Sequence, residues 1–168
     1  NDTAFEMATS NIRFGEGITA EIGMDLSDAG HQTALVITDE NLAKLPPVEN
    51  TLASLETSKI SYQLYKQVRV EPNDQSFLHA IRFAEEQAFD CIVAVGGGSG
   101  IDTAKAVNLY TTYPADLLDY VNAPIGKGKP VPGPVKPLYA IPTTCGTGSE
   151  TTGVSIFDLS SIHAKTGI

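Results

Sequence analysis

The chain has 168 residues and a formal net charge of −9. This length suits a single domain with a sizeable core, and the acidic balance argues against a nucleic-acid surface, which is usually basic. No apolar run approaches the roughly 20 residues that span a membrane. The two cysteines, Cys91 and Cys145, lack close spacing, which predicts free thiols in a reducing compartment. The acidic charge and the lack of a long apolar run therefore predict neither a nucleic-acid partner nor a membrane partner.

Strand-like and helix-like segments alternate along the chain, the pattern of an α/β domain with a doubly wound, mostly parallel sheet. In the first half we expect a strand at 33–38 (TALVIT), a short helix at 41–44, a helix at about 48–58, a strand within 60–70 and a helix at about 74–87. The Pro46-Pro47 pair should interrupt the first of these helices, because proline lacks the backbone N–H that a helix interior needs.

The second half begins with 89–95 (FDCIVAV), an apolar run without alternation that predicts a strand buried on both faces. A helix should follow, with Ser99 as its N-cap residue. Five prolines and three glycines make residues 122–137 an irregular loop, and a strand is expected at 138–141.

Three consecutive glycines, Gly96 to Gly98, join the buried strand to this helix. Without Cβ atoms they let another molecule approach the main chain, and the free N–H groups of a helix N-terminus favour an anion, most often phosphate. The spacing matches neither the G-x-G-x-x-G fingerprint nor a Walker A loop. A tight turn without a ligand is the alternative.

Polar residues follow the expected strands, where open α/β sheets bind ligands. Asp39 comes directly after the TALVIT strand, where it either accepts hydrogen bonds from an adenosine ribose and favours NAD over NADP, or caps a helix. Asn73, beside Pro72, predicts an Asx-type turn when it is considered alone.

Pro142 to Gly153 (PTTCGTGSETTG) is rich in hydroxyls and glycines, so it suits contacts with a nicotinamide ribose or a pyrophosphate, and a polar surface loop is the alternative. Cys145 lies in this loop without a nearby histidine, which makes it a poor candidate nucleophile. The histidines at 31, 79 and 163 offer no H-x-x-x-H pair, so we expect them to face solvent and to bind no metal.

The segments GGGSGIDTAKA and PTTCGTGSETT, some forty residues apart, resemble the nucleotide-binding motifs of the iron-containing alcohol dehydrogenases. Within that family, AFEMATSNIRFGEG, NLAKLPPVENTL, VRVEPND and LDYVNAPIGKGKPV resemble the mitochondrial hydroxyacid-oxoacid transhydrogenase branch. The resemblance implies the Rossmann-like amino-terminal domain of a two-domain, dehydroquinate-synthase-like fold. It also implies that a dinucleotide contacts Asp39, Asn73, Gly97, Gly98, Ser99, Asp102, Thr143, Thr144, Thr147, Thr152 and Lys165.

For activity, the resemblance implies that residues 1–168 bind NAD(H), whereas a helical domain that this chain lacks supplies the ligands of a divalent metal, iron or zinc. We therefore expect no catalytic or metal-ligating residue here and no catalysis by these residues alone. Further implications are hydroxyacid and oxoacid substrates, a mitochondrial matrix or cytoplasmic location, and compatibility with a homodimer. Ordinary iron-containing alcohol dehydrogenases, glycerol dehydrogenases and dehydroquinate-synthase-like lyases would share this half, and a non-catalytic nucleotide-binding module remains an alternative.

An acidic substrate would need a cationic partner, and the proline-rich loop contains Lys127, Lys129 and Lys136. These lysines either reach toward a substrate carboxylate or form a solvated basic loop. The second interpretation is favoured, since exposed charges are the norm.

Overall fold

A four-stranded parallel sheet organises the computed structural model, which describes residues 10–168. The strands, in the spatial order β2-β1-β3-β4, are β1 (Thr33–Ile37), β2 (Ser61–Tyr65), β3 (Cys91–Gly96) and β4 (Leu138–Pro142). Parallel pairing joins each neighbouring pair, from Thr33 opposite Ser61 to Gly96 opposite Pro142. The expected α/β fold with a parallel sheet is confirmed.

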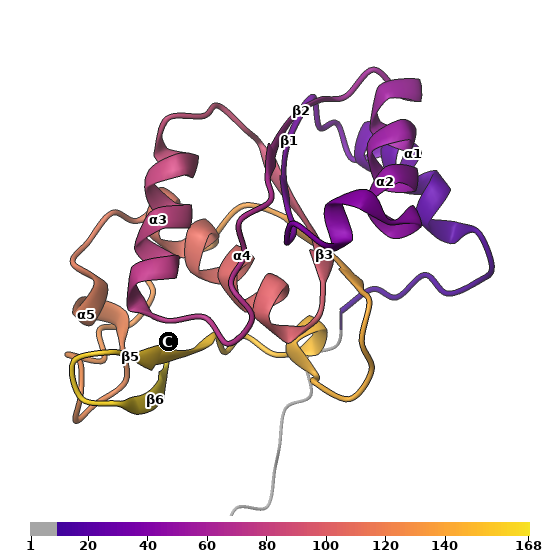
Figure 1. Ribbon diagram of the computed structural model, residues 1–168. Coiled ribbons are helices and arrows are strands. Elements are labelled where there is room, and N and C mark those ends of the chain that lie inside the picture. Colours follow the sequence, from indigo (N-terminus) through magenta and orange to yellow (C-terminus); the bar gives the residue numbers. More distant parts are fainter. Residues whose placement is uncertain (1–9) are drawn as a thin grey trace, which may run out of the picture.

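Helices cover both faces of the sheet, and the twofold repeat of the strands sends alternate side chains to each face (Figure 1). Leu35 and Ile37 pack under α3 (Asp74–Glu85) and α4 (Gly98–Thr112). Ala34 and Val36 pack under α1 (Ile22–Asp28) and α2 (Pro46–Thr57). Every residue of β3 is buried, which explains why its sequence is continuously apolar.

Two local predictions need correction. Pro46 and Pro47 begin α2 instead of only interrupting a helix, because a first-turn N–H has no intrahelical partner and proline sacrifices nothing there. The preceding short helix is a single 3₁₀ turn, Leu42–Lys44. Ser99 is not an N-cap residue: Gly97 occupies that position and Ser99 lies inside the first turn of α4.

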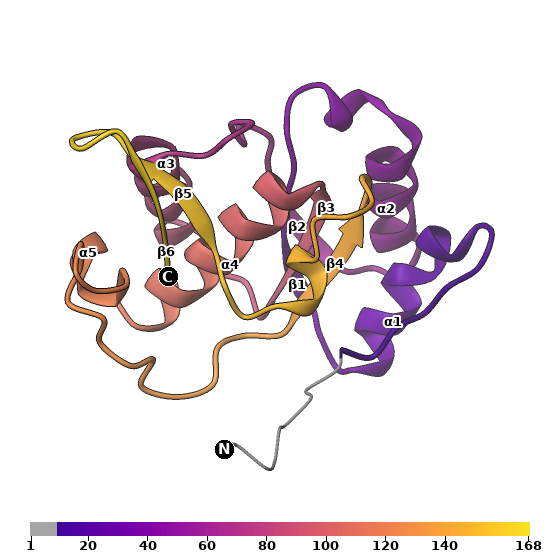
Figure 2. The ribbon, with the colours of Figure 1, turned by 90° about the horizontal axis from the view of Figure 1, so that it is seen from below.

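A small antiparallel hairpin, β5 (Ile156–Leu159) and β6 (Ala164–Gly167), was not predicted from the sequence. It packs beside α3 and α4, as Figure 2 shows. Phe157 anchors it, with its ring 5.0 Å from the ring of Phe77. The helical turns η1 (Ile18–Glu21), α5 (Leu117–Tyr120) and η3 (Ser149–Thr151) complete the elements of the described chain.

The remaining boundaries follow the predicted elements closely, since α3 and β3 are each within two residues of the expected limits. The first residues of the AFEMATSNIRFGEG stretch lie outside the described part of the chain. Over residues 10–168, the helices are all too short or too polar to traverse a lipid bilayer.

Candidate functional site

The candidate site lies at the carboxyl edge of the sheet, where parallel strands direct their following loops to one side. Asp39 follows β1, the glycine loop follows β3, and the hydroxyl-rich loop follows β4. The segment after β2 reaches the same edge, because the backbone N–H of Glu71 donates to Ser99 Oγ over 3.2 Å. Segments far apart in the sequence therefore meet around the first turn of α4.

The N-terminus of α4 is free of side-chain caps. Gly97 is extended (φ −80°, ψ −165°), and its carbonyl oxygen accepts from the N–H groups of Gly100 and Ile101 over 3.1 Å each. No side chain of the described residues accepts from the earlier N–H groups of this 15-residue helix. These donors and the positive end of the helix dipole are available to an anion.

The glycines also make room for the loop after β4. A Cβ atom on Gly97 would lie 2.6 Å from Thr144 Oγ1, and one on Gly98 would lie 3.2 Å from Ser149 Oγ. Gly100 differs, since a Cβ there would meet nothing closer than 3.9 Å. Close approach by the hydroxyl-rich loop is therefore one physical reason for bare backbone at Gly97 and Gly98.

Asp39 caps the turn that follows β1. Its Oδ1 accepts from the N–H groups of Asn41 and Leu42 over 2.9 and 3.0 Å, which leaves Oδ2 without a protein donor in the described chain. The preceding residue, Thr38, is fully buried, and its hydroxyl has no hydrogen-bond partner among residues 10–168. Asp39 thus caps the turn with Oδ1, whereas its Oδ2 is available to a ligand.

Asn73 forms a capping box at the start of α3. Its Oδ1 accepts from the N–H of Ser76 over 2.9 Å, while Ser76 Oγ accepts from the N–H of Asn73 over 2.9 Å. The expected local turn role is therefore present in the form of a helix cap. The amide nitrogen also donates to Ser160 Oγ over 3.4 Å, which links α3 to the β5–β6 turn.

Asp102 lies one turn into α4 and connects this helix to the hairpin. Its Oδ2 accepts from the N–H of Ile156 over 3.2 Å, and its carbonyl oxygen accepts from Ser155 Oγ over 2.8 Å. Asp102 is only 7% exposed. These two hydrogen bonds hold the start of β5 against α4.

Lys105 is a further member of this network that the site prediction from sequence omitted, although the DTAK segment contains it. Its ammonium group donates to the carbonyl oxygen of Val154 over 2.7 Å and to Thr152 Oγ1 over 3.3 Å. It also lies 3.5 Å from Asp102 Oδ1. Burial lowers the pKa of Lys105, and the Asp102 carboxylate opposes that shift. A partly buried cation thus holds the end of the hydroxyl-rich loop, a contact that the sequence alone does not reveal.

The remaining predicted residues lie along the same edge or on the hairpin. Thr143 donates its backbone N–H to the carbonyl oxygen of Gly96 over 3.1 Å, while Thr147 Oγ1 accepts from the N–H of Ser149 over 3.3 Å. Lys165 is mostly exposed on β6, with its ammonium group 3.9 Å from Asp158 and 4.0 Å from Glu71.

The histidine prediction holds only in part. His79 and His163 are exposed, but His31 is largely covered, with Nε2 3.2 Å from the Tyr139 hydroxyl and Nδ1 3.3 Å from Asp90. His31, Asp90 and Cys91 are the one potential metal-ligand group found among residues 10–168, and they lie at the amino edge of the sheet, away from the glycine loop. Burial raises the pKa of Cys91 to about 12, so this thiol is protonated at neutral pH.

The lysines of the proline-rich loop have protein partners. Lys127 and Lys129 donate to the two carboxylate oxygens of Asp119 over 2.6 and 2.9 Å. The ammonium group of Lys136 lies 4.9 Å from the centre of the Phe89 ring. Lys127 and Lys129 are 61% and 52% exposed, so these lysines are solvated, as the favoured interpretation of a basic loop expects, and they are also paired with Asp119.

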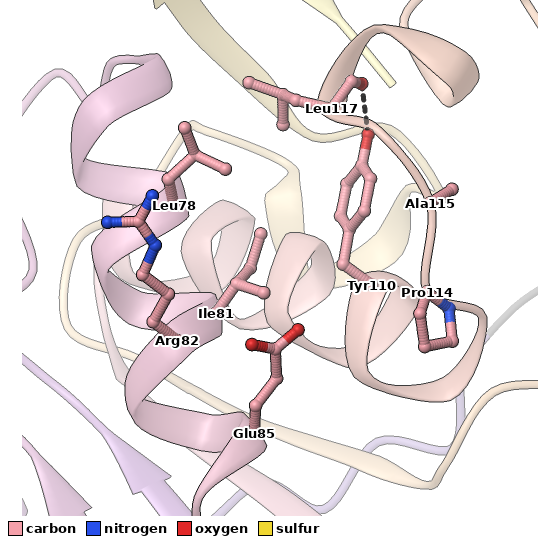
Figure 3. Close-up of a pocket in the computed structure, with 8 residues that line it drawn as sticks. All are labelled: Leu78, Ile81, Arg82, Glu85, Tyr110, Pro114, Ala115 and Leu117. Carbon is pink, nitrogen blue, oxygen red and sulfur yellow. Dashed lines mark hydrogen bonds between the residues drawn. The ribbon is translucent and has the colours of Figure 1, made fainter.

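Two hollows lie beside α3, one between α3 and α4 and one next to the hairpin. One, of about 150 Å³, lies between α3 and α4, where Tyr110 donates to the carbonyl oxygen of Leu117 and Arg82 and Glu85 lie at the side (Figure 3). The other, of about 370 Å³, lies between the segment before α3 and the β5–β6 turn. It shares Asn73 with the predicted dinucleotide site.

Comparison with known proteins places these features in a family. Residues 9–168 match the family model described as iron-containing alcohol dehydrogenase. The chain is 60% identical over 168 residues to the mitochondrial hydroxyacid-oxoacid transhydrogenase of Mus musculus and 58% identical to that of Homo sapiens. Each alignment covers 99% of this chain and 36% of the relative, so the chain spans about a third of the length of these relatives.

A solved structure shows the same architecture. The alcohol dehydrogenase from Oenococcus oeni superposes with a TM-score of 0.87 at 29% sequence identity. The match covers 98% of this chain and 42% of that protein. The parallel sheet and its carboxyl edge are thus shared with a solved alcohol dehydrogenase.

Proposed function

Since the chain belongs to the iron-containing alcohol dehydrogenase family, we propose that it forms the NAD(H)-binding part of a metal-dependent oxidoreductase. The observation that carries this proposal is the uncapped N-terminus of α4, which follows a glycine loop at the carboxyl edge of a parallel sheet. Such a terminus suits the pyrophosphate of a dinucleotide. The Oδ2 of Asp39, which has no protein donor among residues 10–168, suits a hydroxyl group of a ribose nearby.

The proposed cofactor-binding residues extend along this edge from β1 to the hairpin. They are Asp39, Asn73, Gly97, Gly98, Ser99, Asp102, Thr143, Thr144, Thr147, Thr152 and Lys165. Asp102 contributes by holding the hairpin against α4, since its contacts are with Ser155 and Ile156. We add Lys105 as a positioning residue, because it holds the segment that contains Thr152.

The divalent metal of the family does not fit the residues described here. Their one group of potential ligands, His31, Asp90 and Cys91, lies at the opposite edge of the sheet from the first turn of α4. We propose that iron or zinc is held by the larger share of the protein, which these residues do not cover. There a metal would polarise the substrate oxygen as a Lewis acid.

For the whole protein we propose a hydroxyacid-oxoacid transhydrogenase, located in the mitochondrial matrix. A hydroxyacid such as 4-hydroxybutyrate would be oxidised to succinic semialdehyde, with its hydride accepted by NAD⁺ held at the proposed cofactor site and its proton released to solvent. An oxoacid such as 2-oxoglutarate would take up this hydride and a proton, giving the corresponding 2-hydroxyacid. The two half-reactions balance without free cofactor, provided that NAD(H) stays bound between them.

The experiment mixes full-length protein with 4-hydroxybutyrate and 2-oxoglutarate without added NAD and measures succinic semialdehyde. Product in amounts far above the enzyme concentration supports the proposal. Product that requires free NAD in substrate amounts favours an ordinary alcohol dehydrogenase instead. Absence of oxidoreductase activity, with NADH binding retained, favours a nucleotide-binding module.

A further inference from the structure

The larger cavity, of about 370 Å³, lies beside the proposed cofactor edge and takes no part in the assignments above except through Asn73. It is lined by Arg69, Asn73, Asp158, Leu159, Ser160 and His163. Two segments form it: the stretch between β2 and α3, and the turn that joins β5 to β6. A backbone hydrogen bond of 2.8 Å from the N–H of Asp158 to the carbonyl oxygen of Pro72 joins the two segments.

The cavity lies on the far side of the glycine loop from Asp39. In Figure 1 the turn after β1 leads to α2 on the right, whereas the hairpin lies to the left of α4. The stretch that contains Arg69 is tied to the first turn of α4 by the hydrogen bond from Glu71 to Ser99. If Asp39 contacts the adenosine ribose, the cavity lies toward the nicotinamide end, where substrate must approach.

The charges around this cavity leave one cation unmatched. Lys165 lies between the two nearby carboxylates, 3.9 Å from Asp158 and 4.0 Å from Glu71. Asp74 accepts from the Ser160 hydroxyl over 2.5 Å. Arg69, in contrast, is exposed and forms neither an ion pair nor a side-chain hydrogen bond with any residue from 10 to 168. An unpaired guanidinium on a protein of net charge −9 is suited to an external anion.

We propose that Arg69 binds the carboxylate of the substrate in this cavity and so makes the enzyme specific for hydroxyacids and oxoacids. A guanidinium presents two parallel N–H groups that match the two oxygens of a carboxylate. The imidazole of His163 lines the same cavity, and its ring N–H can donate a further hydrogen bond to a carboxylate. This inference rests on the proposed function, because it concerns the substrate of the same site.

The test compares full-length wild-type protein with Arg69→Gln, Arg69→Lys and the control Arg82→Gln. Arg82 is an exposed arginine on α3 that lines the other, smaller cavity. We expect Arg69→Gln to raise KM at least about ten-fold for both substrates, the hydroxyacid and the oxoacid, which is the scale of a charged hydrogen bond. Arg69→Lys should recover part of this loss, and Arg82→Gln should resemble wild type. NADH affinity should stay unchanged in all three variants, which excludes a folding defect.

A binding measurement separates this inference from the transhydrogenase proposal. Succinate is titrated calorimetrically into each protein in the presence of saturating NADH. Binding to wild type that weakens at least about ten-fold in Arg69→Gln, but not in Arg82→Gln, supports the carboxylate site even if hydroxyacid turnover is absent. Equal KM values and equal succinate affinity in wild type and Arg69→Gln would overturn it. Transhydrogenase activity in wild type would then still support the proposed function.

Discussion

Lys105 donates a 2.7 Å hydrogen bond from its ammonium group to the carbonyl oxygen of Val154, 49 residues further along the chain. This contact joins the interior of α4 to the segment between η3 and β5. The ammonium group is also within 3.5 Å of Asp102 on its own helix. One partly buried cation, with a side chain that is 13% exposed, therefore holds the end of the hydroxyl-rich loop and the segment after it against α4.

Replacing Lys105 with methionine should weaken NADH binding about ten-fold, because the loss of charged hydrogen bonds costs about 1.5–3 kcal/mol and releases the loop that contains Thr152. Fluorescence titration of NADH measures the effect. Lys59→Met is the matched control, since Lys59 is exposed in the turn between α2 and β2. If both variants bind NADH like the parent, Lys105 has no positioning role.

Substitutions of three glycines should have different effects. Gly98→Val should reduce NADH affinity strongly, because a Cβ there already lies 3.2 Å from Ser149 Oγ and branched methyl groups would cover the N–H groups of α4. Gly97→Ala should displace Thr144, because the new Cβ atom would lie 2.6 Å from Thr144 Oγ1. Gly100→Ala should leave binding intact and raise the melting temperature, since its Cβ finds space and alanine favours a helix by about 1 kcal/mol. Parent-like NADH binding by Gly98→Val would contradict the assignment of this loop.

Two substitutions of Asp39 separate the effect of its negative charge from the effect of its capping hydrogen bonds. Asp39→Asn keeps an Oδ1 acceptor for Asn41 and Leu42 but removes the negative charge, whereas Asp39→Gly removes both. Both variants should narrow the preference for NADH over NADPH by about 1 kcal/mol or more, and only the glycine variant should lose stability from the missing cap. Affinities for both nucleotides and melting temperatures test this. An unchanged affinity ratio in Asp39→Asn would leave Asp39 with its capping role alone.

Asp90 lies at the amino edge of the sheet, and we expect it to make the free energy of unfolding depend on pH. Burial acts to raise its pKa, but hydrogen bonds from the N–H groups of Gln32 and Thr33 outweigh that effect, so the pKa is lowered. A carboxylate with a depressed folded-state pKa stabilises the fold above its unfolded pKa, and this contribution is lost as pH falls through the folded value. Asp90→Asn should therefore lower the melting temperature at neutral pH and have a smaller effect in strong acid, below the folded-state pKa. An equal loss under both conditions would argue against ionisation as the cause.

Features that depend on local physical chemistry could be predicted from the residues alone. Continuous apolar residues from Cys91 to Val95 predict a strand covered on both faces, and the glycines after them predict a break before a helix. The alternation of strands and helices then requires a parallel sheet, whose loops converge at one edge. The strands of the parallel sheet and the helices α2, α3 and α4 were therefore predictable from the sequence, whereas α1 and α5 were not predicted.

Contacts between distant segments emerge only from the folded chain, because no sequence period records them. The partners of Lys105 lie 47 and 49 residues away, and the hairpin reaches α3 through the contact of Phe157 with Phe77. Ser99 illustrates the same limit: its residue type predicts a cap, but in the folded chain Gly97 is the N-cap residue, and Thr144 lies where a Cβ atom on Gly97 would be. Arg69 lines a cavity only because the β5–β6 turn folds back beside it, and that packing depends on side chains some ninety residues away.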